Sequence, residues 1–350
     1  MKTISINDVI QTNRKPVEVT QLPQPDFNPS SNERRIVLGV SSMRDHMSDE
    51  GYQITSGLAS NGYTHVGHGL DLPLTHIPDI LKKTEPGTVL VQDIREWGKE
   101  GDSFRDLRAE FTGISELQKH PEIFRLTILK DSHQRPQYHS DAAQNMSCHA
   151  WVVYYHPRIV NNLAPYTRLE HLIRTYHSVD LDVVCDFKPE IKEGCLLSGA
   201  ISGAYPLRKR IHNVARLLGI DVLAHPGYHR NGTNTPGFFK TLEKYKVHIC
   251  TASRYGYALR KIVESSAAGC RVITDLPIDD VLPEIDENLI RISPDIPISD
   301  LSEVVRESVT SYDPEKQDHI RQKTLAFYNV IDVTRRLADD IESLRKKYNG

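Results

Sequence analysis

The chain has 350 residues, of which 39% are apolar and 25% charged, and its formal net charge is −3. This composition is typical of a globular protein with room for two domains, and the charge gives no general attraction to nucleic acid or to an anionic membrane. No apolar window is long enough for a membrane span, the first residues lack the apolar core of a secretory signal, and the five cysteines form no CxxC pair. We therefore expect a cytoplasmic protein with reduced thiols.

Residues 1–33 contain four prolines among polar residues without periodicity, and we interpret them as an arm on the surface. After this arm, short apolar runs alternate with helical patterns, which is typical of a parallel sheet covered by helices on both faces. Strands are expected at 34–40, 63–69, 88–93, 124–131, 149–156, 194–200, 220–225, 246–253 and 271–275. Helices are expected at 49–62, 75–83, 103–119, 139–147, 205–219, 235–245, 258–269 and 315–347. We interpret the stretch at 176–193 as the hinge between two Rossmann-like halves.

The helix expected at 205–219 begins with Pro206 and then carries Arg208, Lys209 and Arg210 in its first turn. A helix start has partial positive charge, so each cation there costs about 0.3–1 kcal/mol unless an anion is bound nearby. This helix directly follows a strand, and the turns at the carboxyl ends of parallel strands are where α/β proteins bind ligands.

The helix expected at 258–269 shows the same conflict, with Arg260 and Lys261 in its opening turn and Arg254 in the loop before it. A diphosphate held by backbone N–H groups and by these cations would resolve the conflict at both helices. The alternative is that both sets of cations form solvated faces whose side chains extend past the sheet edge. Two such helices in one half favour the anion site. Both loops also contain small residues that let the backbone approach a phosphate closely, namely Gly199, Ser202, Gly203, Ser253 and Gly256.

Glu264 lies one turn after these cations. Its carboxylate could accept hydrogen bonds from ribose hydroxyls beside a bound diphosphate, whereas the alternative is an ion pair within the helix, with Arg260 or Lys261. The face expected to be buried carries Leu259, Ile262, Val263, Ser266 and Ala267.

The stretch SRYGYALRKIVESSAAGCRVITD at 253–275 resembles the donor-site helix and following strand of the GT-B glycosyltransferases. It is most similar to the retaining "glycosyltransferases group 1" branch and its spore-maturation-protein-like relatives. SGAISGAYPLRKR at 198–210 is similar to the first strand, loop and helix of the donor domain in that family. LASNGYTHVGHG at 58–69 is similar to the opening of the acceptor domain.

The resemblance implies a GT-B fold, an α/β architecture of two Rossmann-like domains whose parallel sheets face a central cleft. Residues 34–187 would form the acceptor-side domain and 188–314 the nucleotide-sugar-binding domain, with helices at 315–350 packing back on the first domain. Position by position, Glu264 matches the glutamate that holds the ribose, and Arg208 and Lys261 match the cations that bind the diphosphate.

The sequence departs from this family at one position. The retaining branch often has a second glutamate near the transferred sugar, eight residues before the ribose glutamate, and this position is Gly256 here. Another group then contacts the sugar, or the chain belongs to a divergent subgroup, or activity is lost.

Further candidates follow other strands. His133 and Asp131 lie at a carboxyl strand end in the amino half, where His133 could orient or deprotonate an acceptor hydroxyl; alternatively, a hydrogen bond to Asp131 braces the loop. In the other half, His225 ends a strand and Tyr228 could stack on a base, although a plain turn explains both. Substrate contacts are expected from Arg208, Lys209, Lys261, Arg260, Glu264, Arg254, Gly256, Tyr257, His225, Tyr228, Gly199 and Ser202.

The sequence contains no GxGxxG after a strand, no GxxxxGK[ST] and no GxSxG, which argues against dehydrogenase, P-loop and α/β-hydrolase chemistry. We expect a glycosyltransferase that moves a sugar from a donor such as a UDP-sugar or GDP-sugar to an acceptor hydroxyl, without a metal or other cofactor. Retention of configuration follows from the resemblance alone. The alternatives are a nucleotide-sugar epimerase of the same fold and an inactive nucleotide-binding module. The acceptor could be a glycan, a small molecule, a protein or a modified nucleic-acid base, and the near-neutral amino half gives nucleic acid no support.

Overall fold

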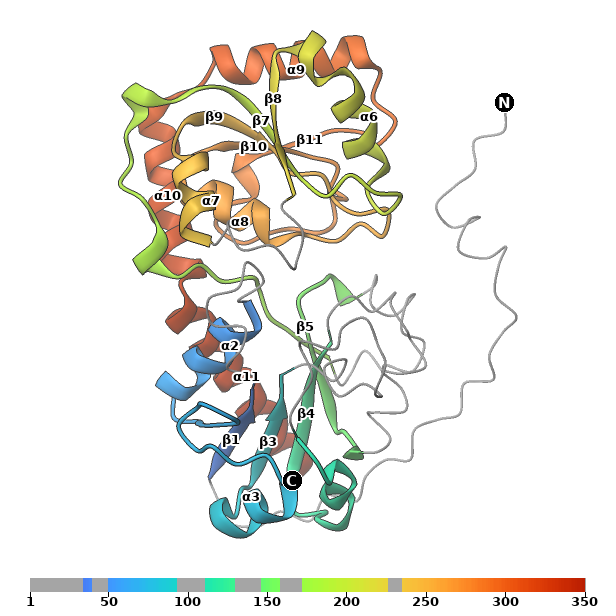
Figure 1. The fold of residues 1–350 in the computed structure, drawn as a ribbon, viewed down its shortest axis with the longest axis vertical. Helices are drawn as coiled ribbons and strands as arrows, with labels where there is room; N and C mark the ends of the chain where they lie inside the picture. Colours follow the sequence, from blue (N-terminus) through green and yellow to red (C-terminus); the bar gives the residue numbers. More distant parts are fainter. Residues whose placement is uncertain are drawn as a thin grey trace, which may run out of the picture.

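The computed structural model describes residues 34–39, 50–92, 111–129, 146–157, 172–225 and 235–349 (Figure 1). These residues build two parallel β-sheets, one in each half of the chain. The arm predicted at 1–33 lies outside them. In the described part of the chain, no helix combines the length and the apolar character that crossing a membrane requires.

The amino-half sheet has the strand order β2-β1-β3-β4-β5-β6. Its strands are β1 (Arg35–Leu38), β2 (Thr64–Val66), β3 (Thr88–Val91), β4 (Phe124–Leu129), β5 (Ala150–Val153) and β6 (Leu172–Arg174). Its helices are α2 (Glu50–Ser60), α3 (Ile77–Thr84) and the 3₁₀ helix η4 (Ile114–Lys119). Alternate residues of β1 and β3 pack on opposite faces: Val37 and Leu90 pack with α2, and Ile36 and Val89 with α3. Burial on both faces explains why the strands appear in the sequence as continuous apolar runs.

The carboxyl-half sheet has the order β11-β10-β9-β7-β8. Its strands are β7 (Glu193–Gly199), β8 (Ile220–Ala224), β9 (Tyr245–Ile249), β10 (Arg271–Thr274) and β11 (Leu289–Arg291). Its helices are α6 (Pro206–Val214), α7 (Thr235–Leu242), α8 (Arg260–Ala267) and α9 (Ile298–Thr310), with the 3₁₀ helix η8 (Ala215–Leu218) after α6. Helices α7 and α8 share one apolar cluster with the sheet, and α6 and α9 share another.

Both sheets have the same doubly wound order, in which the second strand lies on one side of the first and the third strand on the other. The order therefore reverses between β1 and β3 in the amino half, and between β7 and β9 in the carboxyl half. In open α/β sheets, ligands bind outside the carboxyl ends of the strands at such a switch point. The fold thus predicts two positions for a site, one in each half.

The end of the chain divides into two helices, α10 (Pro314–Tyr328) and α11 (Val330–Asn349), where the sequence predicts one at 315–347. Asn329 has extended backbone (ψ 151), and its side-chain oxygen accepts a hydrogen bond from the N–H of Asp332 at 2.9 Å. The break is fixed by Val179, whose backbone pairs with Tyr328 and Val330 on either side of Asn329.

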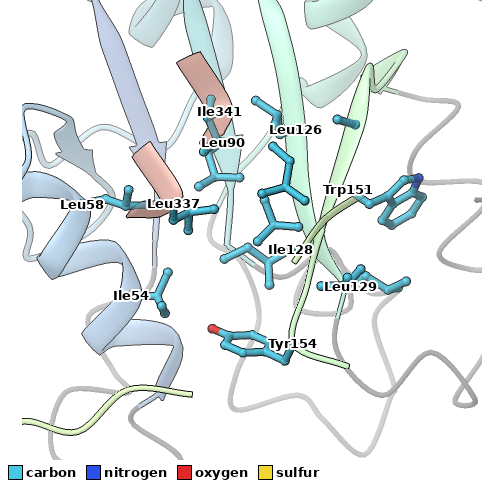
Figure 2. Packing of buried hydrophobic residues seen from close by; sticks show 14 of the residues in the cluster. Ile54, Leu58, Leu90, Leu126, Ile128, Leu129, Trp151, Tyr154, Leu337 and Ile341 are labelled. Atoms are coloured by element: carbon cyan, nitrogen blue, oxygen red, sulfur yellow. The ribbon is translucent and has the colours of Figure 1, made fainter. Parts of the chain in front are cut away.

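The two final helices pack on different halves. Helix α10 packs against α8, and Tyr328 belongs to the apolar cluster of the carboxyl half, whereas α11 packs against α2. Figure 2 shows Leu337 and Ile341 of α11 in the amino-half core, near Leu58 and Leu90. For α10, the expectation that residues 315–350 pack back on the amino half differs from the structure, because α10 packs against α8 of the carboxyl half. The predicted domain boundaries stay predictions.

The predicted strands correspond to β1–β5 and β7–β10, and the sequence misses β6, β11 and α9. Strands β6 and β11 both have the sequence Leu-Ile-Arg, so each strand contains only two consecutive apolar residues. In the range 103–119, where a helix is predicted, the structure describes residues 111–119, of which Ile114–Lys119 form η4. Most of the helix predicted at 139–147 lies outside the described residues.

Candidate functional site

Two cations converge on Gly199, the last residue of β7, at the switch point of the carboxyl-half sheet. A Cβ atom added to Gly199 would lie 2.5 Å from Lys261 Nζ and 2.6 Å from Arg208 Nη1. The φ of Gly199 is +112, a conformation that residues with side chains rarely adopt. The backbone at this strand end therefore requires glycine, and it brings together the cations from the first turns of α6 and α8.

Arg208 is 2% exposed and is held by the two loops of the switch point. Its Nε donates to Thr251 Oγ1 at 3.1 Å, its Nη2 to the Thr251 carbonyl at 3.2 Å, and its Nη1 to the Ala200 carbonyl at 3.2 Å. Its guanidinium also lies 3.9 Å from the centre of the Tyr205 ring. Arg208 is thus not part of a solvated face, and its position is fixed before any ligand binds.

Lys261 points toward the sheet, where its Nζ donates to Ser198 Oγ at 3.2 Å. In the described part of the chain, no carboxylate lies within ion-pair distance of this ammonium group. Burial and the nearby charge of Arg208 lower the pKa of Lys261 to about 8. Arg208, which is buried, and Lys261, which is half-buried, are adjacent cations, and together they create a local positive field that an anion would relieve.

His225, which follows β8, lies within this field. Burial, and then the charges of Lys261 and Arg208, lower the pKa of its imidazole. His225 therefore lies close enough to Lys261 and Arg208 to be affected by their charges.

The starts of α6 and α8 are suited to an anion. Neither N-cap residue, Tyr205 or Leu259, caps its helix through its side chain, and neither first turn contains an acidic residue. The N–H groups of a first turn without such a cap favour negative charge.

Glu264 is paired with Arg260 one turn earlier on α8, with 3.0 Å between Arg260 Nε and Glu264 Oε1. Both side chains are largely buried, at 12% and 8% exposure. The structure thus shows the intrahelical ion pair that the sequence leaves open as the alternative to a ribose contact. The predicted buried stripe is confirmed for Ile262, Val263, Ser266 and Ala267, whereas Leu259 is half-buried.

The loop before α8 connects the site to its surroundings. The N–H of Arg254 donates to the Ala204 carbonyl at 2.8 Å and so ties this loop to the loop after β7. The side chain of Arg254 is exposed and contacts Tyr255. Gly256 has a φ of +72, so the backbone at this position favours glycine.

Tyr257 is buried and stacks on Tyr155 of the amino half, with ring centroids 3.8 Å apart. The ring of His177 adds a second contact between the halves, because its Nε2 lies 2.9 Å from the Ala258 carbonyl and its Nδ1 contacts Glu50. The structure therefore places Tyr257 in the joint between the halves.

The remaining predicted residues either have exposed side chains or lie outside the described residues. Ser202 and Lys209 are exposed. His133, Asp131 and Tyr228 lie outside the described residues.

Sequence reasoning missed three polar residues at the switch point: Ser198, Thr251 and Asp275. The Asp275 carboxylate accepts a hydrogen bond from the N–H of Ala252 at 2.6 Å, while Arg208 donates to the Thr251 carbonyl of the same peptide. Burial raises the pKa of Asp275 to about 6. Each of the three residues lies at or just beyond the end of a strand, and this position was the signal available in the sequence.

Comparison with known proteins places this geometry in a known fold. No protein-family model and no curated protein sequence matches the chain. Among solved structures, the chain is similar to HepE from Anabaena in complex with UDP-glucose. The match covers 88% of this chain and 99% of HepE, with a TM-score of 0.57 and 9% identity. A glycosyltransferase from Rickettsia africae covers 90% of this chain and 99% of its own, at a TM-score of 0.55 and 11% identity. The match to the lipopolysaccharide outer core galactosyltransferase WaaB covers 89% of this chain and 99% of WaaB, with a TM-score of 0.52 and 11% identity. These similarities span both sheets, and they show that the chain has the GT-B fold of two Rossmann-like domains.

Proposed function

We propose that this protein is a glycosyltransferase that transfers a sugar from a nucleotide diphosphate sugar to an acceptor hydroxyl. The observation that carries the proposal is the convergence of Arg208 and Lys261 on Gly199 at the switch point of the carboxyl-half sheet. Support comes from the similar fold of HepE, whose structures contain UDP and UDP-glucose. The proposal includes both UDP-sugars and GDP-sugars as donors.

The arrangement suits the departure of a diphosphate. When the bond between the sugar and the diphosphate breaks, negative charge grows on the leaving group. Arg208 and Lys261 would stabilise this charge, and the first-turn N–H groups of α6 and α8 would add to it. These fixed cations can do the work that a divalent metal does in other transferases, so the proposed transfer is metal-independent.

Two further parts of the proposal follow from the resemblance of residues 253–275 to the retaining branch. We propose retention of configuration on that basis, and we propose that Glu264 binds the ribose, which requires its carboxylate to be shared between Arg260 and the ligand. In the amino half, we propose that His133 and Asp131 orient or deprotonate the acceptor hydroxyl. This hydroxyl could belong to a glycan, a small molecule, a protein or a modified nucleic-acid base.

Isothermal titration with UDP and GDP tests the proposal. At least one of them should bind, and Lys261→Ala should weaken its binding about tenfold or more, because a charged contact to phosphate is lost. Lys244→Ala, which removes an exposed cation from the same half, is the matched control and should leave the affinity unchanged.

Failure of every nucleoside diphosphate to bind would remove the proposed function. Incubation with a panel of nucleotide sugars separates the alternatives. Hydrolysis of a donor argues against an inactive module, and formation of an epimer without added acceptor would identify an epimerase.

A further inference from the structure

A closed ring of hydrogen bonds lies between α8 and the sheet, and it begins and ends on Lys261. Lys261 Nζ donates to Ser198 Oγ at 3.2 Å, and Ser198 Oγ lies 2.9 Å from His248 Nε2. His248 Nδ1 lies 2.5 Å from Ser265 Oγ, which donates to the Lys261 carbonyl at 2.5 Å. Ser198, His248 and Ser265 are 3%, 0% and 0% exposed, so water does not complete these contacts.

Strand register and helix period together place these residues. In the parallel pair β7 and β9, His248 is the register partner of Leu196, so His248 and Ser198 point to the same face of the sheet. Helix α8 covers that face, and its Lys261 and Ser265 lie one turn apart. Two adjacent strands and one helix therefore close the ring.

The contacts of Ser265 favour one arrangement of the protons in this ring of hydrogen bonds. Ser265 has one hydroxyl proton, and it is donated to the Lys261 carbonyl within the helix. In this arrangement the Ser265 oxygen accepts a hydrogen bond from His248 Nδ1–H, which places a proton on Nδ1.

The protonation of the second imidazole nitrogen, His248 Nε2, follows from the charge of the imidazole. Burial, and then the charges of Lys261 and Arg208, lower the pKa of His248 well below its usual value, so the ring is neutral and Nε2 carries no proton. Ser198 donates to Nε2, and its lone pair is then directed at the Lys261 ammonium. Cys250 is the other titratable group in contact with the ring of His248, 3.3 Å from Nδ1, and burial raises the pKa of its thiol to about 12, so it adds no charge.

We propose that His248 is a positioning residue of the diphosphate site, acting through Ser198 to hold the Lys261 ammonium beside Gly199. The inference rests on the proposed function only in that Lys261 is taken to bind the diphosphate. It assigns a role to a histidine that has no surface exposure and that no ligand can touch.

The ring can be tested without any ligand, by nitrogen-15 NMR of the imidazole in the full chain. A protonated Nδ1 and a bare Nε2 are expected from about pH 6 to about pH 8. A charged imidazolium, or a proton on Nε2 instead, would overturn the proposal.

Its effect on binding can be tested with Ser198→Ala and His248→Phe. Each should weaken UDP binding roughly tenfold and leave the binding of uridine unchanged, because uridine has no phosphate for Lys261 to contact. Ser198→Thr, which retains the hydroxyl, should restore the affinity. The matched control is Ser266→Ala, which removes another buried hydroxyl of α8 that donates to a helix carbonyl.

A double-mutant cycle separates positioning from a general loss of structure. In a Lys261→Ala background, Ser198→Ala should have no further effect on UDP binding. Two results would refute the positioning role. One is that Ser198→Ala weakens the binding of UDP and of uridine equally, and the other is that Ser198→Ala weakens UDP binding just as much in the Lys261→Ala background. If the unmodified protein binds no nucleoside diphosphate, the proposed function fails. The NMR experiment still tests the proton arrangement in the ring of hydrogen bonds.

Discussion

The two halves of the molecule share a strand order but place different side chains beside a glycine at the switch point. Gly39 follows β1 and Gly199 ends β7, and in each case a Cβ would collide with a nitrogen: His65 Nε2 at 2.4 Å and Lys261 Nζ at 2.5 Å. Burial lowers the pKa of His65 to about 4, so the group beside Gly39 is a neutral imidazole, whereas the group beside Gly199 is an ammonium with Arg208 next to it. The same strand order thus places a possible site in both halves, and the side chains decide which half attracts an anion.

The largest expected effect separates the two glycines. Gly199→Ala should weaken UDP binding about a hundredfold, because the added methyl displaces both cations and the residue is strained at its positive φ. Gly39→Ala should lower the thermal stability of the amino half but leave UDP affinity unchanged. Titration and thermal unfolding of both variants check this contrast. Equal losses of UDP affinity in the two variants would contradict it.

The second prediction uses pH. Because the pKa of Lys261 is about 8 in the free protein and a bound diphosphate would raise it, binding must take up a proton above that pH. UDP affinity should therefore fall about tenfold from pH 7 to pH 9. Titrations at both values measure this change, and Lys261→Ala should abolish it. A pH dependence that persists in Lys261→Ala would point to another group.

The smallest expected effect concerns Glu264. If its carboxylate is shared between Arg260 and a ribose, Glu264→Gln should reduce the preference for UDP over 2′-deoxy-UDP by a few-fold. Competitive titration of the two nucleotides in both proteins measures this ratio. An unchanged ratio would mean that Glu264 serves only its ion pair with Arg260.

The sequence predicts most of the fold, because strands buried on both faces appear as apolar runs. It misses the break at Asn329, because the pairing partner Val179 is distant in the sequence. At the site, Arg208 and Lys261 are detectable because cations at a helix start conflict with its partial charge. Ser198 and His248 are not detectable in this way, because each lies inside a strand and its partners lie on other elements.

A crystal structure of the protein with UDP tests the central claim most directly. The account predicts diphosphate oxygens within hydrogen-bonding distance of Lys261 Nζ and the Arg208 guanidinium, over Gly199. A diphosphate bound elsewhere, with both cations contacting only protein atoms, would contradict it.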